Sequence, residues 1–200
     1  MIGVTGLPAC GKSTVTGMLG RLGAETLDAD RLVHAALESR AVARRVADLL
    51  GIAPPRPPSR LDRAAVAAVV FRRGNDRLRR RLEGLLHPLV RADLRSGVAA
   101  ARRRRVPAVV LEVPLLFEGR GDRMCDFTVF VDAPLRVRAA RARRRGWTGA
   151  DLRAREARFL PAAERRRRAD FTVDNGGTRA ATRRQVRELW KRTVTDRRSR

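Results

Sequence analysis

The strongest constraint on the fold of this chain is the segment Gly6-Leu7-Pro8-Ala9-Cys10-Gly11-Lys12-Ser13. It matches the spacing G-x-x-x-x-G-K-[ST], in which glycines let successive backbone N–H groups turn inward around a phosphate. The apolar, β-branched run 1–5 precedes it, and residues 13–22, with apolar side chains at helical spacing, follow it. Because strand, loop and helix is the context that this motif needs, we predict a phosphate-binding loop that opens a helix.

Each part of this loop has a chemical task. The N-terminus of the helix adds partial positive charge, Lys12 reaches the β- and γ-phosphates, and the Ser13 hydroxyl binds Mg²⁺. A chance match in a glycine-containing turn is the alternative. The chain has 16 glycines and only two lysines, so a random match has a probability of roughly one in a thousand. We therefore assign nucleotide binding to Gly6, Leu7, Pro8, Ala9, Cys10, Gly11, Lys12, Ser13 and Thr14.

Length and composition favour one intracellular domain. Two hundred residues suit a single domain with room for a lid or an insertion. The two cysteines form no disulfide framework, which is typical of a reducing cytosol. The chain runs directly into the first strand, so we expect no signal peptide, and no apolar run approaches the roughly 20 residues that cross a bilayer. We expect a cytoplasmic protein without a membrane partner, as a monomer or weak homo-oligomer.

The net charge of +24 is open to several interpretations. The charge could bind nucleic acid or small polyanions such as nucleotides. It could also reflect the codon bias of a GC-rich genome, which favours Arg over Lys. The arginine runs are not interleaved with aromatic residues, and there is no tyrosine to stack on single strands. We therefore expect no nucleic-acid partner, although a basic nucleic-acid-binding protein with this loop stays as the alternative of another class.

Strand and helix patterns alternate along the chain, which predicts an α/β fold with a parallel sheet and right-handed crossovers. The strand runs are almost continuously apolar, as a sheet covered on both faces requires. We expect strands at 1–5, 24–27, 106–113, 127–132 and 171–174. We expect helices at 13–22, 31–50 with a break around Ser39, 61–71, 76–86, 88–103, 134–144, 146–169 and 180–194.

Acidic residues follow two of these strands. Ligands bind outside the carboxyl ends of parallel strands, so an aspartate of Asp28-Ala29-Asp30 could accept a proton or help to hold Mg²⁺. The alternative is that an aspartate there only caps the next helix. We expect both roles, with one aspartate as the cap and the other in the chemistry. The segment from Glu112 to Glu118 could be a wall of the acceptor site with an acidic group near the metal, or only a strand end that enters an apolar loop.

Arginines and histidines carry weaker signals. Most arginines between Arg141 and Asp170 are expected on a solvated helical face. One or two of them would neutralise charge if this segment closes as a lid over phosphates, although spacing does not choose which. His34 and His87 lie in helical patterns without neighbouring ligands, which favours structural or surface positions.

Several segments together resemble the dephospho-CoA kinase family over nearly the whole chain. They are the loop with Val4-Thr5, Leu27 to Asp30, Leu61-Asp62-Arg63, Val70-Phe71, Leu82 to Pro88, Val113 to Glu118, Arg155 to Pro161, Ala169-Asp170 and Val173 to Gly176. The resemblance implies that ATP phosphorylates the ribose 3′-hydroxyl of dephospho-CoA, the last step of coenzyme A synthesis. Another small-metabolite or nucleotide kinase of the same fold is the nearer alternative.

The resemblance also implies roles for single residues. Asp30 matches the general base, Lys12 and Ser13 the phosphate and Mg²⁺ positions, and Arg145 the catalytic lid arginine. Arg155 and Asn175 would contact the nucleotide, and the substrate-binding residues would be Asp30, His87, Pro114, Leu115 and Leu116. The family usually has glycine in place of Leu7, Gly-Ser in place of Ala9-Cys10, and often Gln in place of Phe159.

The expected architecture is a three-layer P-loop kinase fold with a central parallel sheet. Its core would comprise 1–37, 104–144 and 170–200. A helical acceptor-binding insertion would occupy 38–103 and a helical lid 145–169.

Overall fold

The computed structural model describes residues 1–53, 61, 63–70 and 75–196. Asp62 and Phe71, which belong to two of the segments that resemble the family, lie outside these described residues. The chain divides into two compact units, one of residues 1–28 and 100–200 and the other of residues 29–99.

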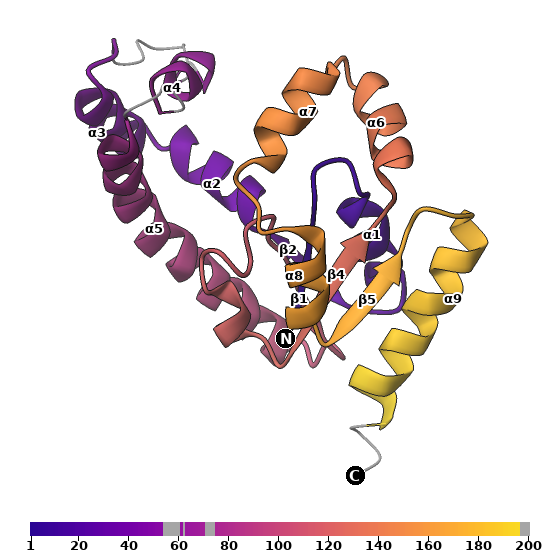
Figure 1. Cartoon of the computed structure of the whole chain (residues 1–200). Helices are drawn as coiled ribbons and strands as arrows, with labels where there is room; N and C mark the ends of the chain where they lie inside the picture. The colour runs from indigo at the N-terminus through magenta and orange to yellow at the C-terminus, as the bar shows by residue number, and fades with distance from the viewer. Residues whose placement is uncertain (54–60, 62, 71–74, 197–200) are drawn as a thin grey trace. The chain divides into compact units, whose positions relative to one another are not determined.

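A five-stranded parallel sheet forms the centre of the first unit (Figure 1). The strand order is β2-β3-β1-β4-β5, and every neighbouring pair is parallel. The strands are β1 (Ile2–Gly6), β2 (Glu25–Asp28), β3 (Val109–Glu112), β4 (Phe127–Asp132) and β5 (Phe171–Asp174). The predicted α/β class with a parallel sheet is confirmed. β3 is shorter than predicted, because Pro107 cannot donate a ladder hydrogen bond near its start.

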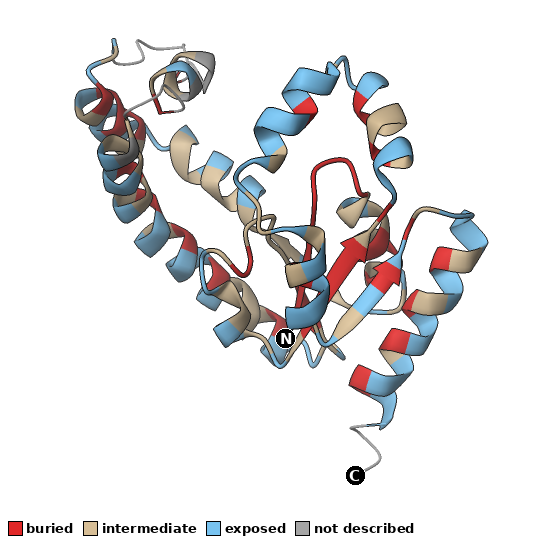
Figure 2. Ribbon diagram, viewed as in Figure 1, coloured by how far each residue is buried: buried red, intermediate tan, exposed pale blue. Residues whose placement is uncertain are grey.

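Helices cover both faces of this sheet. Val4, Val129 and Val131 pack in one core with residues of α1 (Lys12–Arg21) and α9 (Arg179–Trp190), and Figure 2 shows the buried strands in red. Successive strand residues point to opposite faces, so Thr5 faces the other side, where it contacts Arg165 of α8 (Ala162–Arg168). The sheet is therefore the middle of three layers.

Two further helices complete the first unit between β4 and α8. They are α6 (Leu135–Arg143) and α7 (Gly149–Glu156). A short 3₁₀ segment at Gly121–Met124 precedes β4, and a short π segment at Lys191–Thr195 follows α9. The predicted helix 146–169 is thus two helices. Pro161 has no backbone N–H with which to continue a helix, so it stands at the start of α8 instead. Thr148 caps α7 in a capping box with Asp151, and the hydrogen bonds that Thr148 donates lower the pKa of that carboxyl.

The second unit is helical. It contains α2 (Ala29–Glu38), α3 (Arg40–Leu50), α4 (Arg63–Val70) and most of α5 (Asp76–Arg103), whose apolar side chains form a second core. α5 is one helix where two were predicted, at 76–86 and 88–103. Pro88 leaves the carbonyl of Gly84 without its N–H partner, and this local cost does not end the helix. Within the part of the chain that the structure describes, no helix is long and apolar enough to cross a membrane.

Candidate active site

The loop between β1 and α1 has the backbone that the motif predicts. Gly11 has a φ of 92°, and a Cβ there would lie 2.2 Å from the Asn175 side-chain nitrogen. A Cβ on Gly6 would meet the Cys10 sulfur and the Val131 carbonyl at 2.5 Å. Ala9 also has a positive φ, 61°, which is strained for an L-residue. Glycine is therefore required at Gly6 and Gly11, and Ala9 holds a conformation that glycine would adopt freely.

Two side chains from distant parts of the chain hold this loop. Asn175, which is buried, donates from Nδ2 to the Cys10 carbonyl at 2.8 Å, and its own Oδ1 accepts from Thr182 at 3.0 Å. Arg141 donates to the same carbonyl and to the Asn175 carbonyl, both at 2.8 Å. Asn175 was predicted beside the nucleotide. The anchoring by Arg141 was missed, because nothing in the spacing distinguishes it from neighbouring arginines.

The two polar side chains that the motif assigns to phosphate and Mg²⁺, Lys12 and Ser13, lie at the start of α1. Lys12 Nζ donates to the Gly6 carbonyl at 3.3 Å, so the lysine folds back over its own loop. Ser13 is exposed. Its hydroxyl fits a Mg²⁺ that takes its remaining ligands from phosphate oxygens and water. Among the described residues no group of three His, Cys, Asp or Glu could hold a metal ion by itself.

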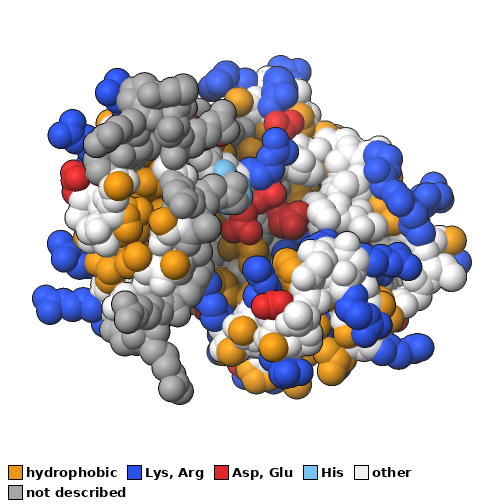
Figure 3. Space-filling model, turned by 90° about the horizontal axis from the view of Figure 1, so that it is seen from above, with side chains coloured by type: hydrophobic (Ala, Val, Ile, Leu, Met, Phe, Trp, Pro, Cys, Tyr) orange, Lys and Arg blue, Asp and Glu red, His pale blue; other side chains and the backbone are white. Residues whose placement is uncertain are grey.

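A cleft of about 450 Å³ opens beside this loop. Its volume lies in the range of small-molecule sites. Four arginines and no acidic residue occur among the described residues that line it, so it favours a polyanion. Figure 3 shows Lys and Arg side chains scattered over one face rather than gathered in one stripe. The lining residues are Gly11, Ser13, Thr14, Arg141, Arg144, Arg145, Asn175, Gly177 and Arg179.

The two predicted lid arginines share one aromatic partner. The Arg155 guanidinium lies 4.1 Å from the centroid of the Trp147 ring, and that of Arg145 lies 5.7 Å from it. Arg145 lines the cleft, whereas Arg155 is exposed on α7 and does not. Glu156 of the same helix pairs with Arg138 of α6, whose pKa is lowered by burial. The Trp147 contacts and this ion pair tie the two helices together.

The acidic residues predicted near the sheet edge have different surroundings. Asp28 ends β2 opposite Glu112 of β3, and Glu112 accepts a 2.8 Å hydrogen bond from Thr16 of α1. Asp30 is in the first turn of α2, in the second unit. His87 is exposed on α5 of that unit. The first unit thus brings the loop, Asn175 and Arg145 together, while two of the predicted substrate residues belong to the other unit.

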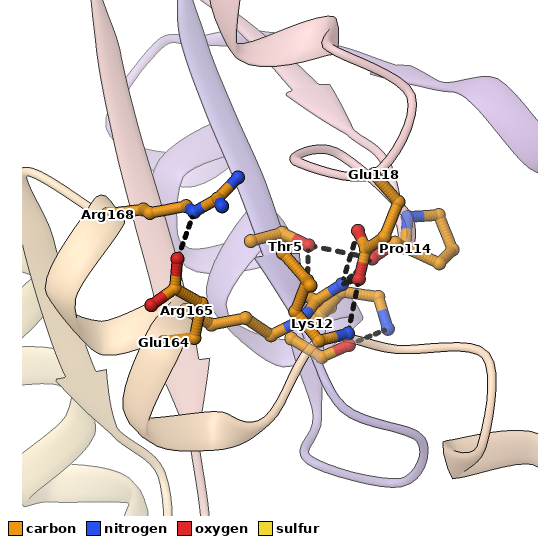
Figure 4. Close-up of polar contacts among 9 residues, drawn as sticks. Thr5, Lys12, Pro114, Glu118, Glu164, Arg165 and Arg168 are labelled. Atoms are coloured by element: carbon orange, nitrogen blue, oxygen red, sulfur yellow. Dashed lines mark hydrogen bonds and ion pairs between the residues drawn. The ribbon is translucent and has the colours of Figure 1, made fainter.

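Glu118 is held by Arg165 (Figure 4). Its carboxylate accepts from Arg165 Nη2 at 2.6 and 2.8 Å and from the Leu160 backbone N–H at 2.7 Å. This carboxylate is therefore engaged in an ion pair with Arg165. Pro114 and Leu115 are half-buried, and Leu116 is completely buried. Arg165 was missed by the sequence analysis because it is one of four consecutive arginines.

Both cysteine thiols are held in the protonated form. Cys10 is completely buried in the loop, and burial raises the pKa of its thiol. Burial also raises the pKa of Cys125 to about 11. Because the thiolate is the reactive species, neither cysteine is suited to act as a nucleophile at neutral pH.

Comparison with known proteins places this geometry in a family. A family model for dephospho-CoA kinase matches residues 1–180. The dephospho-CoA kinase of Gluconobacter oxydans is 41% identical over 199 residues, which cover 96% of each protein. The crystal structure of TT1252 from Thermus thermophilus is 32% identical, with a TM-score of 0.83 over 96% of this chain and 97% of that one. Shikimate kinase from Acinetobacter baumannii, at 16% identity and a TM-score of 0.53 over 98% of this chain and 93% of that one, shares the fold alone.

Proposed function

The chain belongs to the dephospho-CoA kinase family, and on this premise we propose that it transfers the γ-phosphoryl group of ATP to the ribose 3′-hydroxyl of dephospho-CoA. The products are coenzyme A and ADP. The observation that best supports phosphoryl transfer is the conformation of the loop Gly6–Ser13. Its Gly11 has a left-handed backbone, which turns the chain into the start of α1.

The phosphates of ATP would lie in this loop, with the rest of the nucleotide in the adjoining cleft. Lys12 would leave the Gly6 carbonyl, 3.3 Å away, for the β- and γ-phosphate oxygens, because a carbonyl is the weaker partner for an ammonium group. Asn175 and the arginine-lined wall support a nucleotide in the cleft. Mg²⁺, when bound at the Ser13 hydroxyl, would neutralise charge between the β- and γ-phosphates.

The acceptor would meet the nucleotide at the carboxyl edge of the sheet. We assign Asp30 as the base that takes the proton of the 3′-hydroxyl as that oxygen attacks the γ-phosphorus, while the β–γ bridging oxygen leaves with ADP. His87 and the segment Pro114, Leu115 and Leu116 would bind the rest of dephospho-CoA. Residues 38–103 would serve as the acceptor-binding insertion.

Residues 145–169 would close as a lid over the transferring group. Arg145 would neutralise the charge that develops on the γ-phosphoryl oxygens, since it already lines the cleft. Arg155 would join it from α7, and the guanidinium groups of both arginines lie over the Trp147 ring. Closure would also exclude water, which competes with the 3′-hydroxyl for the phosphoryl group.

An acceptor panel tests this function. We expect ATP-dependent ADP release with dephospho-CoA, and little with adenosine, shikimate or gluconate. Lys12→Ala should lose turnover by about 10²-fold or more at saturating ATP, because it removes a charge that acts on the transition state. The matched control is Lys191→Ala, since Lys191 is the only other lysine and is exposed. Preferred turnover of another acceptor, or an active Lys12→Ala variant, would refute the assignment.

A further inference from the structure

Arg165 differs from the three arginines that follow it on α8. The side chains of Arg166, Arg167 and Arg168 are 58%, 74% and 45% exposed, whereas that of Arg165 is 0% exposed. A charged group is buried completely only where it is paired and hydrogen-bonded. The surroundings of Arg165 therefore indicate a specific task that its neighbours do not share.

Arg165 joins three segments that are far apart in the sequence. Its Nη1 donates to the Thr5 hydroxyl at 2.8 Å, and its Nη2 donates to the Pro114 carbonyl at 3.0 Å and to both Glu118 carboxylate oxygens (Figure 4). Thr5 itself donates to the Pro114 carbonyl at 2.8 Å. Thr5 lies in β1 directly before the loop, and Pro114 and Glu118 bound the turn after β3. The guanidinium thus ties this turn to the strand that carries the phosphate-binding loop.

The same cluster fixes the end of the proposed lid. Glu118 also accepts from the Leu160 backbone N–H, just before α8, and the Arg165 guanidinium lies 4.8 Å from the centroid of the Phe159 ring. Glu118 is therefore bound by Leu160 and by Arg165, both in the segment that leads from α7 back to the sheet. The turn from Pro114 to Glu118, strand β1 and the end of the proposed lid thus meet at one ion pair, whose guanidinium is completely buried and whose carboxylate is 19% exposed.

Stability alone is a poor explanation for this arrangement. Burying an ion pair costs desolvation, and well-packed apolar residues in its place are often neutral or stabilising. Such a pair fixes the relative positions of the two segments that carry it, because the planar guanidinium and the carboxylate hydrogen-bond in only a few orientations.

We propose that Arg165 is a positioning residue: through Glu118 and the Pro114 carbonyl it holds the turn Pro114–Glu118 at a fixed place beside the phosphate-binding loop. This inference rests on the proposed function, in which that turn is a wall of the acceptor site. Arg165 itself touches neither substrate. Its loss should loosen the acceptor wall while the nucleotide cleft, which Gly11, Arg141 and Asn175 build without it, keeps its shape.

The first experiment compares Arg165→Lys with Arg167→Lys, a conservative change two residues away on the exposed face. Lysine keeps the charge but cannot reproduce the fork of contacts. We expect the KM for dephospho-CoA to rise about tenfold in Arg165→Lys, since small misplacements of a substrate wall are costly. The KM for ATP and the Kd for ADP should change less than about twofold. Unchanged acceptor KM, or an equal rise in both KM values, overturns the proposal.

A second variant separates positioning from folding. Arg165→Met/Glu118→Leu replaces the ion pair by apolar side chains and should restore the melting temperature that Arg165→Met alone loses. We expect its acceptor KM to stay raised, because the bond to the Pro114 carbonyl is still missing. Recovery of the wild-type KM together with the melting temperature would make the contact purely structural, and the proposal would fail.

Amide hydrogen exchange measures how firmly the turn Pro114–Glu118 is held, and it does not depend on enzymatic activity. The backbone N–H groups of Gly119 and Gly121 donate to the Leu115 and Leu116 carbonyls at 3.0 and 2.8 Å. Exchange over residues 114–121 should accelerate about tenfold in Arg165→Lys and stay unchanged in Arg167→Lys. Unchanged exchange in both variants overturns the anchoring. A wild-type protein that exchanges as expected but does not phosphorylate dephospho-CoA refutes the proposed function instead.

Discussion

At the scale of single residues, the phosphate-binding loop depends on two of its own glycines and on two side chains from distant parts of the chain. The motif predicts glycine at Gly6 and Gly11. The structure requires it, because a side chain at either position would place its Cβ within 2.5 Å of another atom. The contacts of Arg141 and Asn175 with the Cys10 carbonyl do not follow from the motif. Those residues lie 131 and 165 positions after Cys10 in the sequence, and only the fold brings them to the loop.

The assignment of the base is tested at the same scale. Asp30→Asn should lower kcat by about 10²–10⁴-fold while the Kd for ATP changes little, because the amide keeps the shape of the carboxylate but cannot accept the proton. Asp28→Asn is the matched comparison, since Asp28 ends β2 two residues earlier. Steady-state kinetics with dephospho-CoA and ATP titrations supply both quantities. A larger loss of kcat in Asp28→Asn would mean that the two roles are exchanged.

At the scale of elements, alternating apolar runs and helical patterns are enough to predict the parallel sheet. The differences arise where one residue competes with its context. Pro88 would end an isolated helix, yet α5 continues through it. Residues 146–169 are charged and helical in pattern, but Pro161 divides them into α7 and α8. Local propensity predicts the type of element, whereas packing decides how far it extends.

The proposed lid supplies the prediction at this scale. Arg145→Ala and Arg155→Ala should lower kcat by about tenfold or more, because each removes charge from the transferring group only when the lid closes. Arg103→Ala, at the exposed end of α5, should leave kcat nearly unchanged. Exposed substitutions of this kind usually change stability by less than about 0.5 kcal/mol, so the melting temperatures should stay close. Equal losses in all three variants, mimicked by added salt, would assign the effect to diffuse positive potential instead.

At the scale of the whole molecule, the net charge of +24 is less informative than it first suggests. Many arginines have a structural partner, as Arg165 has Glu118 and Arg138 has Glu156. Others line the cleft beside the loop, where they suit a nucleotide. The boundaries of insertion and lid stay predictions, because the sequence indicates helices there without indicating what they close upon.

The most direct test of the central claim is to identify the product of a single reaction. Wild-type protein with ATP, Mg²⁺ and dephospho-CoA should yield ADP and coenzyme A in equal amounts. Phosphorus NMR and mass spectrometry should locate the new phosphate on the ribose 3′-oxygen, and Lys12→Ala should form neither product at a comparable rate. Release of ADP without a phosphorylated acceptor, or a phosphate at another position, would contradict the account.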